Sequence, residues 1–183
     1  MAIKSGWTTP NKIITVSLTG PVFNIYPETE LASHKVVNEG DSVTIRITRS
    51  QDTSQTNYVR IIESWRKDQM SAKIGSDVID SFIGREFTFL PNETEKKFIV
   101  QTIDDNLQES SESYDLVGIV IDGPNGTEIS PDQSGANPQF QYHRGSTTDS
   151  SFYAPRGQFR VRIKDNDTSI TPTPSYALST SAS

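Results

Sequence analysis

The feature that most constrains the fold is an alternation of apolar and polar residues that recurs along the chain. It is clearest near the end, where Phe159, Val161 and Ile163 alternate with three cationic residues. Successive side chains of a strand point to opposite faces of a sheet, so this pattern predicts one buried and one solvated face. Similar runs lie at 14–18, 43–48, 87–89 and 98–102, and residues 114–121 are apolar enough on both faces to form a central strand.

Together these short runs and the turn residues between them predict an all-β fold, an antiparallel β-sandwich. Two segments fall outside the pattern. Residues 124–155 are rich in Gly, Ser, Pro, Gln and Asn, and we expect a long loop excursion before the last strand. Residues 168–183 are mostly Ser, Thr and Pro, which is the composition of an irregular tail.

Composition excludes several classes of function. The chain of 183 residues has no cysteine and only two histidines, which excludes thiolate metal sites, cysteine nucleophiles and multi-histidine metal sites. Its net charge of −6 makes nucleic acid and membrane surfaces poor partners. We find no nucleophile elbow, no phosphate loop and no apolar N-terminal segment typical of a secretory signal. The sequence therefore predicts a protein that is not an enzyme.

Acidic residues gather where the predicted strands end, at 39–41, 77, 104–112 and 165–167. Strand ends meet at the two poles of a sandwich, so these places can converge. Calcium binds 6–8 oxygen atoms from carboxylates and backbone carbonyls, which loops at a pole supply together. The alternative is that these are solvated acidic turns, since Asp and Asn are common turn residues. A catalytic pair at Glu109 and Glu112 would need a cleft, which nothing in the sequence indicates.

The order of five motifs resembles the Calx-beta family. They are Val37-Asn38-Glu39-Gly40-Asp41, Gly75-Ser76-Asp77, residues 87–94, residues 103–112, and Ile163-Lys164-Asp165-Asn166-Asp167. The resemblance implies a seven-stranded, immunoglobulin-like β-sandwich over residues 22–167, preceded by an N-terminal extension over residues 1–21. It also implies Ca²⁺ at one pole. The implied ligands are Glu39, Asp77, Asp104, Asp105, Glu109, Glu112, Asp165 and Asp167, with the Leu107 carbonyl as a further candidate.

The sequence departs from the family pattern at three places. Asn166 stands in the middle of what is often a run of three aspartates, and Asn106 stands where another aspartate is common. Asp77 is followed by Val78 instead of the usual tyrosine. Fewer carboxylates imply weaker calcium binding, or one or two ions where other members hold more.

We therefore expect a non-enzymatic structural or adhesive sandwich that is stabilised by calcium. Modules of this family usually sit in long exported chains, whereas this short chain starts at Met1 and shows no signal peptide. That combination favours a virion component, such as a phage decoration, tail or adaptor protein, which binds other subunits of an assembly through 124–155 and 168–183. The alternative is a calcium-sensing regulatory or cell-surface adhesion module from a larger protein, and the expected location is a virion or the extracellular surface.

Overall fold

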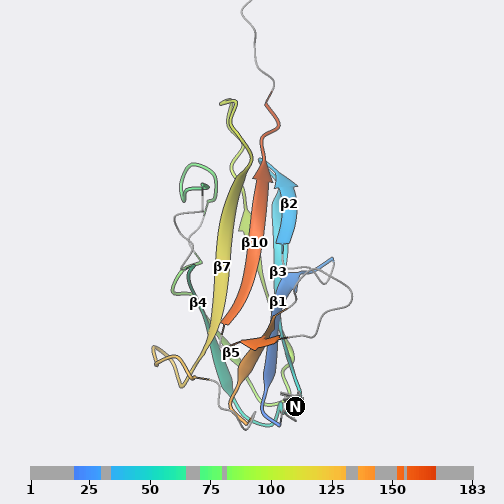
Figure 1. Cartoon of the computed structure of the whole chain (residues 1–183), viewed down its shortest axis with the longest axis vertical. Helices are drawn as coiled ribbons and strands as arrows, with labels where there is room; N and C mark the ends of the chain where they lie inside the picture. The colour runs from blue at the N-terminus through green and yellow to red at the C-terminus, as the bar shows by residue number, and fades with distance from the viewer. Residues whose placement is uncertain are drawn as a thin grey trace, which may run out of the picture.

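The computed structural model describes residues 19–29, 34–64, 71–79, 82–130, 136–142, 152–154 and 156–167. The predicted strand at 14–18 and the tail from 168 to 183 lie outside them. The described residues form ten strands and no helix (Figure 1). The strands are β1 (Val22–Pro27), β2 (His34–Asn38), β3 (Ser42–Ser50), β4 (Asn57–Glu63), β5 (Glu86–Phe89), β6 (Glu95–Gln101), β7 (Glu112–Ile121), β8 (Gln139–Tyr142), β9 (Phe152–Ala154) and β10 (Arg156–Lys164).

The strands form two five-stranded sheets that pack into a sandwich, which confirms the predicted fold class. One sheet has the order β6-β3-β1-β8-β9 and the other β2-β10-β7-β4-β5. Neighbouring strands are antiparallel except for β1 with β8 and β2 with β10. The strand count differs from the expected seven, partly because β8 and β9 lie in the segment 124–155 that we expected to be a loop.

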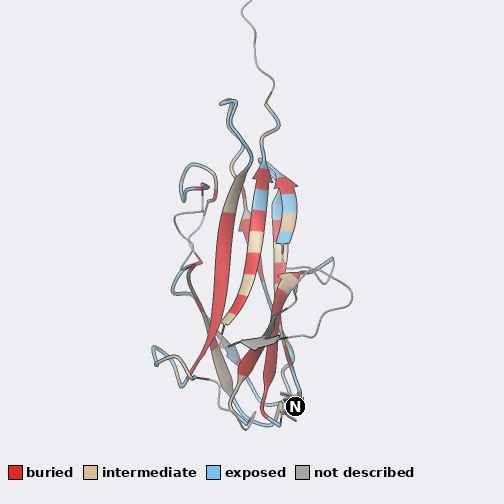
Figure 2. Ribbon diagram, in the orientation of Figure 1, coloured by how far each residue is buried: buried red, intermediate tan, exposed pale blue. Residues whose placement is uncertain are grey.

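The burial pattern follows the sequence alternation. In β10, Phe159, Val161 and Ile163 are buried while the cations between them are not, as the banding in Figure 2 shows. β7 lies between β10 and β4 and is buried on both faces from Tyr114 onward, which confirms the predicted central strand. No helix among the described residues is long and apolar enough to cross a membrane.

Phe140 of β8 joins the two sheets. Its ring is fully buried against Gly118 and Gly157, which face each other in the register of β7 and β10. A Cβ atom added at Gly157 would lie 2.3 Å from the Cδ1 atom of Phe140, and one at Gly118 would lie 2.7 Å from Cζ. Only glycine leaves room for the ring at these two positions, because real Cβ contacts do not come that close. The segment around Phe140 is therefore part of the sandwich.

The topology brings the acidic loops to one end of the molecule, which we call the acidic pole. β2 and β10 run parallel, so Glu39 and Asp165, which follow them, leave the sheet at the same end (Figure 1). The loop from 104 to 111 connects β6 to β7 and lies at this end as well. The register of β10 with β7 pairs Ile163 with Glu112 there.

Candidate metal centre

Six of the eight predicted ligands lie in two clusters at the acidic pole. Cluster 1 consists of Glu39, Asp105 and Asp167, and cluster 2 consists of Asp77, Glu109 and Glu112. In each cluster, one carboxylate oxygen from every member lies within 4.8 Å of the others. The convergence that the sequence predicted is therefore present. The role of these residues as ligands stays a prediction.

The turn between β2 and β3 fixes one side of cluster 1. Gly40 has a φ of 77°, a conformation that L side chains rarely adopt, and a Cβ atom there would lie 3.0 Å from that of Asp104. The N–H of Glu39 donates to the carbonyl of Lys164 at 3.2 Å. On the other side, the Oδ1 atom of Asp105 accepts the N–H of Leu107 at 2.7 Å. Glycine at position 40 thus lets the loops that carry Glu39 and Asp105 approach closely.

Two carboxylate oxygen atoms of cluster 1 are buried without a hydrogen-bond donor from the described residues. The Oε2 atom of Glu39 and the Oδ2 atom of Asp167 are shielded from solvent, and neither accepts a hydrogen bond from a described residue. Buried polar atoms in folded proteins are nearly always bonded, so an orphaned pair needs an explanation such as an ion. Burial, followed by the neighbouring carboxylates, raises the pKa of both Glu39 and Asp167. Cluster 1 is therefore a place where negative charge is costly in the absence of a cation.

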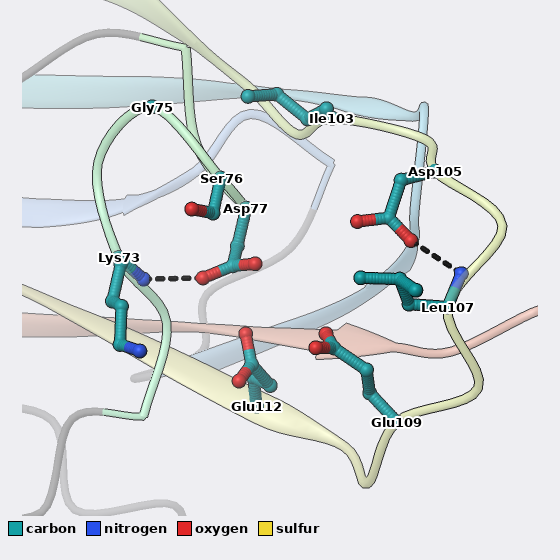
Figure 3. A pocket seen from close by; sticks show the side chains of 9 residues that line it. All are labelled: Lys73, Gly75, Ser76, Asp77, Ile103, Asp105, Leu107, Glu109 and Glu112. Carbon is teal, nitrogen blue, oxygen red and sulfur yellow. Dashed lines mark hydrogen bonds between the residues drawn. The ribbon is translucent and has the colours of Figure 1, made fainter.

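Cluster 2 lies in a pocket between the loops at 73–77 and 103–109. The carboxylates of Asp77, Glu109 and Glu112 line it, and Figure 3 shows the side chains of Glu109 and Glu112 on the side of the pocket facing Asp77. Asp105 of cluster 1 lines the same pocket, so the two clusters adjoin. Burial, and then the charges of Asp77 and Glu109, raise the pKa of Glu112 to about 7.

The other two predicted ligands, Asp165 and Asp104, accept hydrogen bonds from the chain. Both oxygens of Asp165 accept backbone N–H groups, Oδ2 from Glu109 and Oδ1 from Asp167, each at 2.7 Å. Asp104 accepts the side-chain amide of Asn166 at 3.3 Å, and the same Nδ2 atom donates to the carbonyl of Glu39 at 3.2 Å. Neither Asp165 nor Asp104 belongs to a cluster.

Asn166 has a role that the sequence did not indicate. From the sequence, we interpreted it only as a missing carboxylate. Its amide bridges two groups that can only accept, a carboxylate and a carbonyl, so a nitrogen atom must face both of them. An uncharged side chain that bridges two loops by hydrogen bonds thus occupies the position where a third aspartate would repel the neighbouring carboxylates. No sequence signal could have found it, because its partners come from two other loops.

The donor set determines the chemistry of the centre. Both clusters consist of carboxylates alone, so each member offers oxygen atoms as ligands. Hard cations such as Ca²⁺ prefer oxygen donors, whereas zinc sites are built mainly from histidine and cysteine. The arrangement therefore suits calcium better than a transition metal.

The raised pKa of Glu112 predicts how the stability of the calcium-free protein depends on pH. A carboxyl group whose pKa is higher in the folded than in the unfolded state stabilises the fold most below its unfolded pKa of 4.5. That contribution is lost as the pH rises through about 7. In chelator, we therefore expect the melting temperature to fall by a few degrees between pH 5 and pH 8, because solvent screening reduces the effect.

Two comparisons isolate this contribution. The pKa values of Glu86 and Glu93 are lowered by hydrogen bonds from Arg60 and Lys96, so their contribution is lost only as the pH falls below about 4.5. The window above pH 5 thus reports the groups whose pKa is raised, and Glu112→Gln should flatten the slope there by removing the contribution of Glu112. A melting temperature that rises with pH in chelator would contradict the prediction.

Comparisons with known proteins give matches among solved structures only. No family model and no curated protein matches the chain. The apo form of the Calx CBD1 domain matches at 20% sequence identity and a TM-score of 0.44, over 79% of this chain and 98% of that one. The Calx CBD2 domain matches at 15% identity and a TM-score of 0.48, over 79% and 86%. A structure described as the calcium binding domain CBD12 of CALX1.1 matches at 18% sequence identity and a TM-score of 0.43, over 79% of this chain and 46% of that one.

Proposed function

We propose that this chain is a non-catalytic calcium-binding β-sandwich module, with clusters 1 and 2 each contributing to a Ca²⁺ site. The observation that carries the proposal is the pair of solvent-shielded, unbonded oxygen atoms on Glu39 and Asp167. A cation between them would neutralise the mutual repulsion of cluster 1 and supply the missing partner. The alternative of solvated turns explains exposed carboxylates but leaves these two atoms unexplained.

Calcium fits the site better than magnesium. Calcium tolerates 6–8 ligands in irregular geometry, whereas magnesium demands a compact octahedron and gives up water reluctantly. The loops at the acidic pole bring together carboxylates from separate segments of the chain, which suits the irregular coordination of calcium. Glu112 would have to ionise on binding, so calcium binding should release protons near neutral pH.

Calcium titration of the chelator-treated full chain by isothermal calorimetry tests the proposal. We expect saturation at two ions per chain, with a dissociation constant below about 10⁻³ M and much weaker binding of magnesium. The control is Asp52→Asn, which removes a charge beyond the far end of β3 and should leave binding unchanged. Absence of calcium binding in the millimolar range would refute the proposal.

The acidic pole favours a calcium-sensing or cell-surface module over a virion component. The carboxylate clusters support a calcium-sensing role, and nothing in the part of the chain that the structure describes points to a virion. Binding of other subunits through 124–155 and 168–183 stays a prediction, as does the virion or extracellular location. Because Phe140 is buried in its own sandwich, the part of 124–155 around it is less available for a partner than its composition indicated.

A further inference from the structure

The strand β2 forms one edge of its sheet. Among the described strands its only neighbour in that sheet is β10, with which it pairs in parallel. In Figure 1, β2 lies on the outside of the sandwich beside β10, and Figure 2 shows exposed bands on both strands. The free side of an edge strand presents backbone groups with which another strand can pair. This edge is therefore a candidate surface for a partner.

Alternate residues of β2 direct their backbone groups toward the free side. The N–H of Glu39 donates to the carbonyl of Lys164, so the odd-numbered residues direct their N–H and C=O groups toward β10, and the even-numbered ones direct theirs away from it. The turn into β3 uses the carbonyl of Asn38, which accepts the N–H of Asp41. The N–H and C=O groups of Val36 bond to no other described residue on the free side, which leaves them available to an added strand.

Two exposed cations accompany this edge on the outer face of the sheet. In the register of the two strands, Arg162 lies beside Val36 and Lys164 lies beside Asn38. Neither cation forms an ion pair or a side-chain hydrogen bond with a described residue, whereas Arg160, which precedes them on that face, is paired with a carboxylate of β7. In a chain of net charge −6, two unpaired cations next to a free strand edge favour an acidic partner.

The inner side of the same edge borders a hollow of about 200 Å³. Val37 of β2 and Val43 of β3 line it and are buried, so part of its wall is apolar. The other residues that line it are polar, namely Glu28, Thr29, Lys35, Ser42 and Thr44. Because Lys35 and Val37 lie on this side of β2, an added strand would direct alternate side chains toward the hollow.

We propose that the free edge of β2 binds an extended, acidic segment of a partner protein by strand addition. In this mode of recognition, main-chain hydrogen bonds supply affinity, and sites for alternate side chains supply specificity. The N–H and C=O groups of Val36 pair with the backbone of the segment. Half of the side chains of the segment then lie on the outer face with the two cations, and the other half point toward the hollow.

The spacing of the strands determines which side chains fit. Neighbouring strands lie about 4.8 Å apart, so an added strand lies about 10 Å from β10. Arg162 and Lys164 have long side chains that reach across β2 over the shorter side chains of Val36 and Asn38. Glutamate covers the rest of the distance from the other side better than the shorter aspartate. On the inner face, the apolar part of the hollow suits a small aliphatic side chain such as valine.

Titration of the full chain with a short, fluorescently labelled peptide of alternating glutamate and valine tests the proposal by fluorescence anisotropy. Chelator is present throughout, so that calcium cannot bridge the peptide to the acidic pole. We expect saturable binding with a dissociation constant below about 10⁻³ M, and weaker binding as added salt screens the charges. A peptide with proline in place of each valine keeps the charge but cannot pair as a strand, and it should bind at least about fivefold more weakly.

A variant of the chain tests the backbone pairing. Val36→Pro removes an N–H that takes no part in the ladder with β10, so this variant should fold, and its affinity for the peptide should fall by about tenfold or more. The matched control is Ile99→Pro on the edge strand β6, at a similarly exposed position whose N–H also faces away from the neighbouring strand. It should leave binding unchanged.

A second variant tests the contribution of charge. Arg162→Gln plus Lys164→Gln changes only exposed side chains, and it should weaken peptide binding by about fivefold and remove most of the salt dependence. The control is Arg46→Gln plus Lys96→Gln, which removes the same charge from the other sheet and should leave the affinity within about twofold of the unaltered chain.

Cations on an edge strand can also serve only to discourage pairing with other chains. Absence of saturable binding of the glutamate–valine peptide would favour that role and overturn the proposal. Equal affinity for the two peptides, or unchanged binding by Val36→Pro, would overturn strand addition and leave two cations that attract any anion, a sulfated polysaccharide included. Equal losses in Val36→Pro and Ile99→Pro would overturn the assignment to β2. Because chelator is present, none of these results depends on the calcium-binding function proposed above.

Discussion

Replacing Arg49 with methionine is expected to lower the free energy of unfolding by about 3–5 kcal/mol, which is the loss typical of breaking a buried charged network. Arg49 is 2% exposed. Its guanidinium donates to the carbonyls of Leu90 and Glu93, each at 2.6 Å. It also donates to the carbonyl of Gln55 at 2.6 Å and to the side chain of Asn57 at 2.8 Å. Methionine fills much of the space but satisfies none of these acceptors, and each buried acceptor left unbonded costs about 1–3 kcal/mol.

Urea denaturation measures the loss directly, and thermal melting should show a decrease of roughly 10 °C. The matched control is Arg46→Met on the same strand. Arg46 pairs with Glu95 on the outer face, where both side chains are 30% exposed, and such pairs contribute about 0–1 kcal/mol. Equal losses for the two variants would show that the guanidinium of Arg49 does not hold the loops at this end of the sandwich.

Arg49 also shows where alternation reaches its limit as a predictor. Val43, Ile45 and Ile47 are buried as predicted, and the same period places residue 49 on the same face. The alternation therefore predicts that residue 49 faces the core. It could not predict that a cation is buried there, because the N–H groups of Arg49 donate to four backbone carbonyls and a side-chain amide from two other stretches, 53–57 and 90–93.

The segment 124–155 contains two strands, β8 and β9, that the sequence did not predict, for a related reason. Its composition is that of a loop, yet β8 pairs in parallel with β1, and Phe140 is fully buried. What makes Phe140 a core residue is the pair Gly118 and Gly157, which lie on two other strands. Strands as short as β8 and β9 carry too little periodicity to be recognised without these tertiary contacts.

The acidic pole was more predictable than either of these features. The stretches at 39–41, 104–112 and 165–167 each follow or precede a strand, and strand ends meet only at the two poles, so the convergence of Glu39 and Asp105 could be predicted from the topology. Asp77 lies in a turn of the loop between β4 and β5, and the strands alone do not place it at this pole. The sequence could not predict which carboxylates belong to a cluster and which accept hydrogen bonds from the chain. Asp165 and Asp104 carry carboxylates as the cluster members do, but both oxygens of Asp165 accept backbone N–H groups, and Asp104 accepts the side-chain amide of Asn166. The cluster members Asp77 and Asp105 accept a backbone N–H with one oxygen each. Which oxygen faces a donor and which faces another carboxylate is decided by loop geometry.

Calcium is expected to raise the melting temperature of the full chain by roughly 5–10 °C over a chelated sample. An ion that binds only the folded state adds RT ln(1 + [L]/Kd), about 2.7 kcal/mol at a hundredfold excess over Kd. For a domain of this size, each kcal/mol moves the melting temperature by about 2–4 °C. Magnesium at the same concentration should shift the midpoint much less, because it dehydrates reluctantly.

The double variant Asp77→Asn plus Asp105→Asn should lose this calcium response, because it removes one carboxylate from each cluster while keeping an oxygen to accept each backbone N–H. In chelator, the same variant should melt at or above the temperature of the unaltered chain, since the carboxylates that remain repel one another less. The control is Asp52→Asn plus Asp122→Asn, which removes the same charge from two turns outside the clusters and should keep the calcium response. A double variant that responds to calcium as the unaltered chain does would place the ion elsewhere, and the two clusters would then be solvated turns.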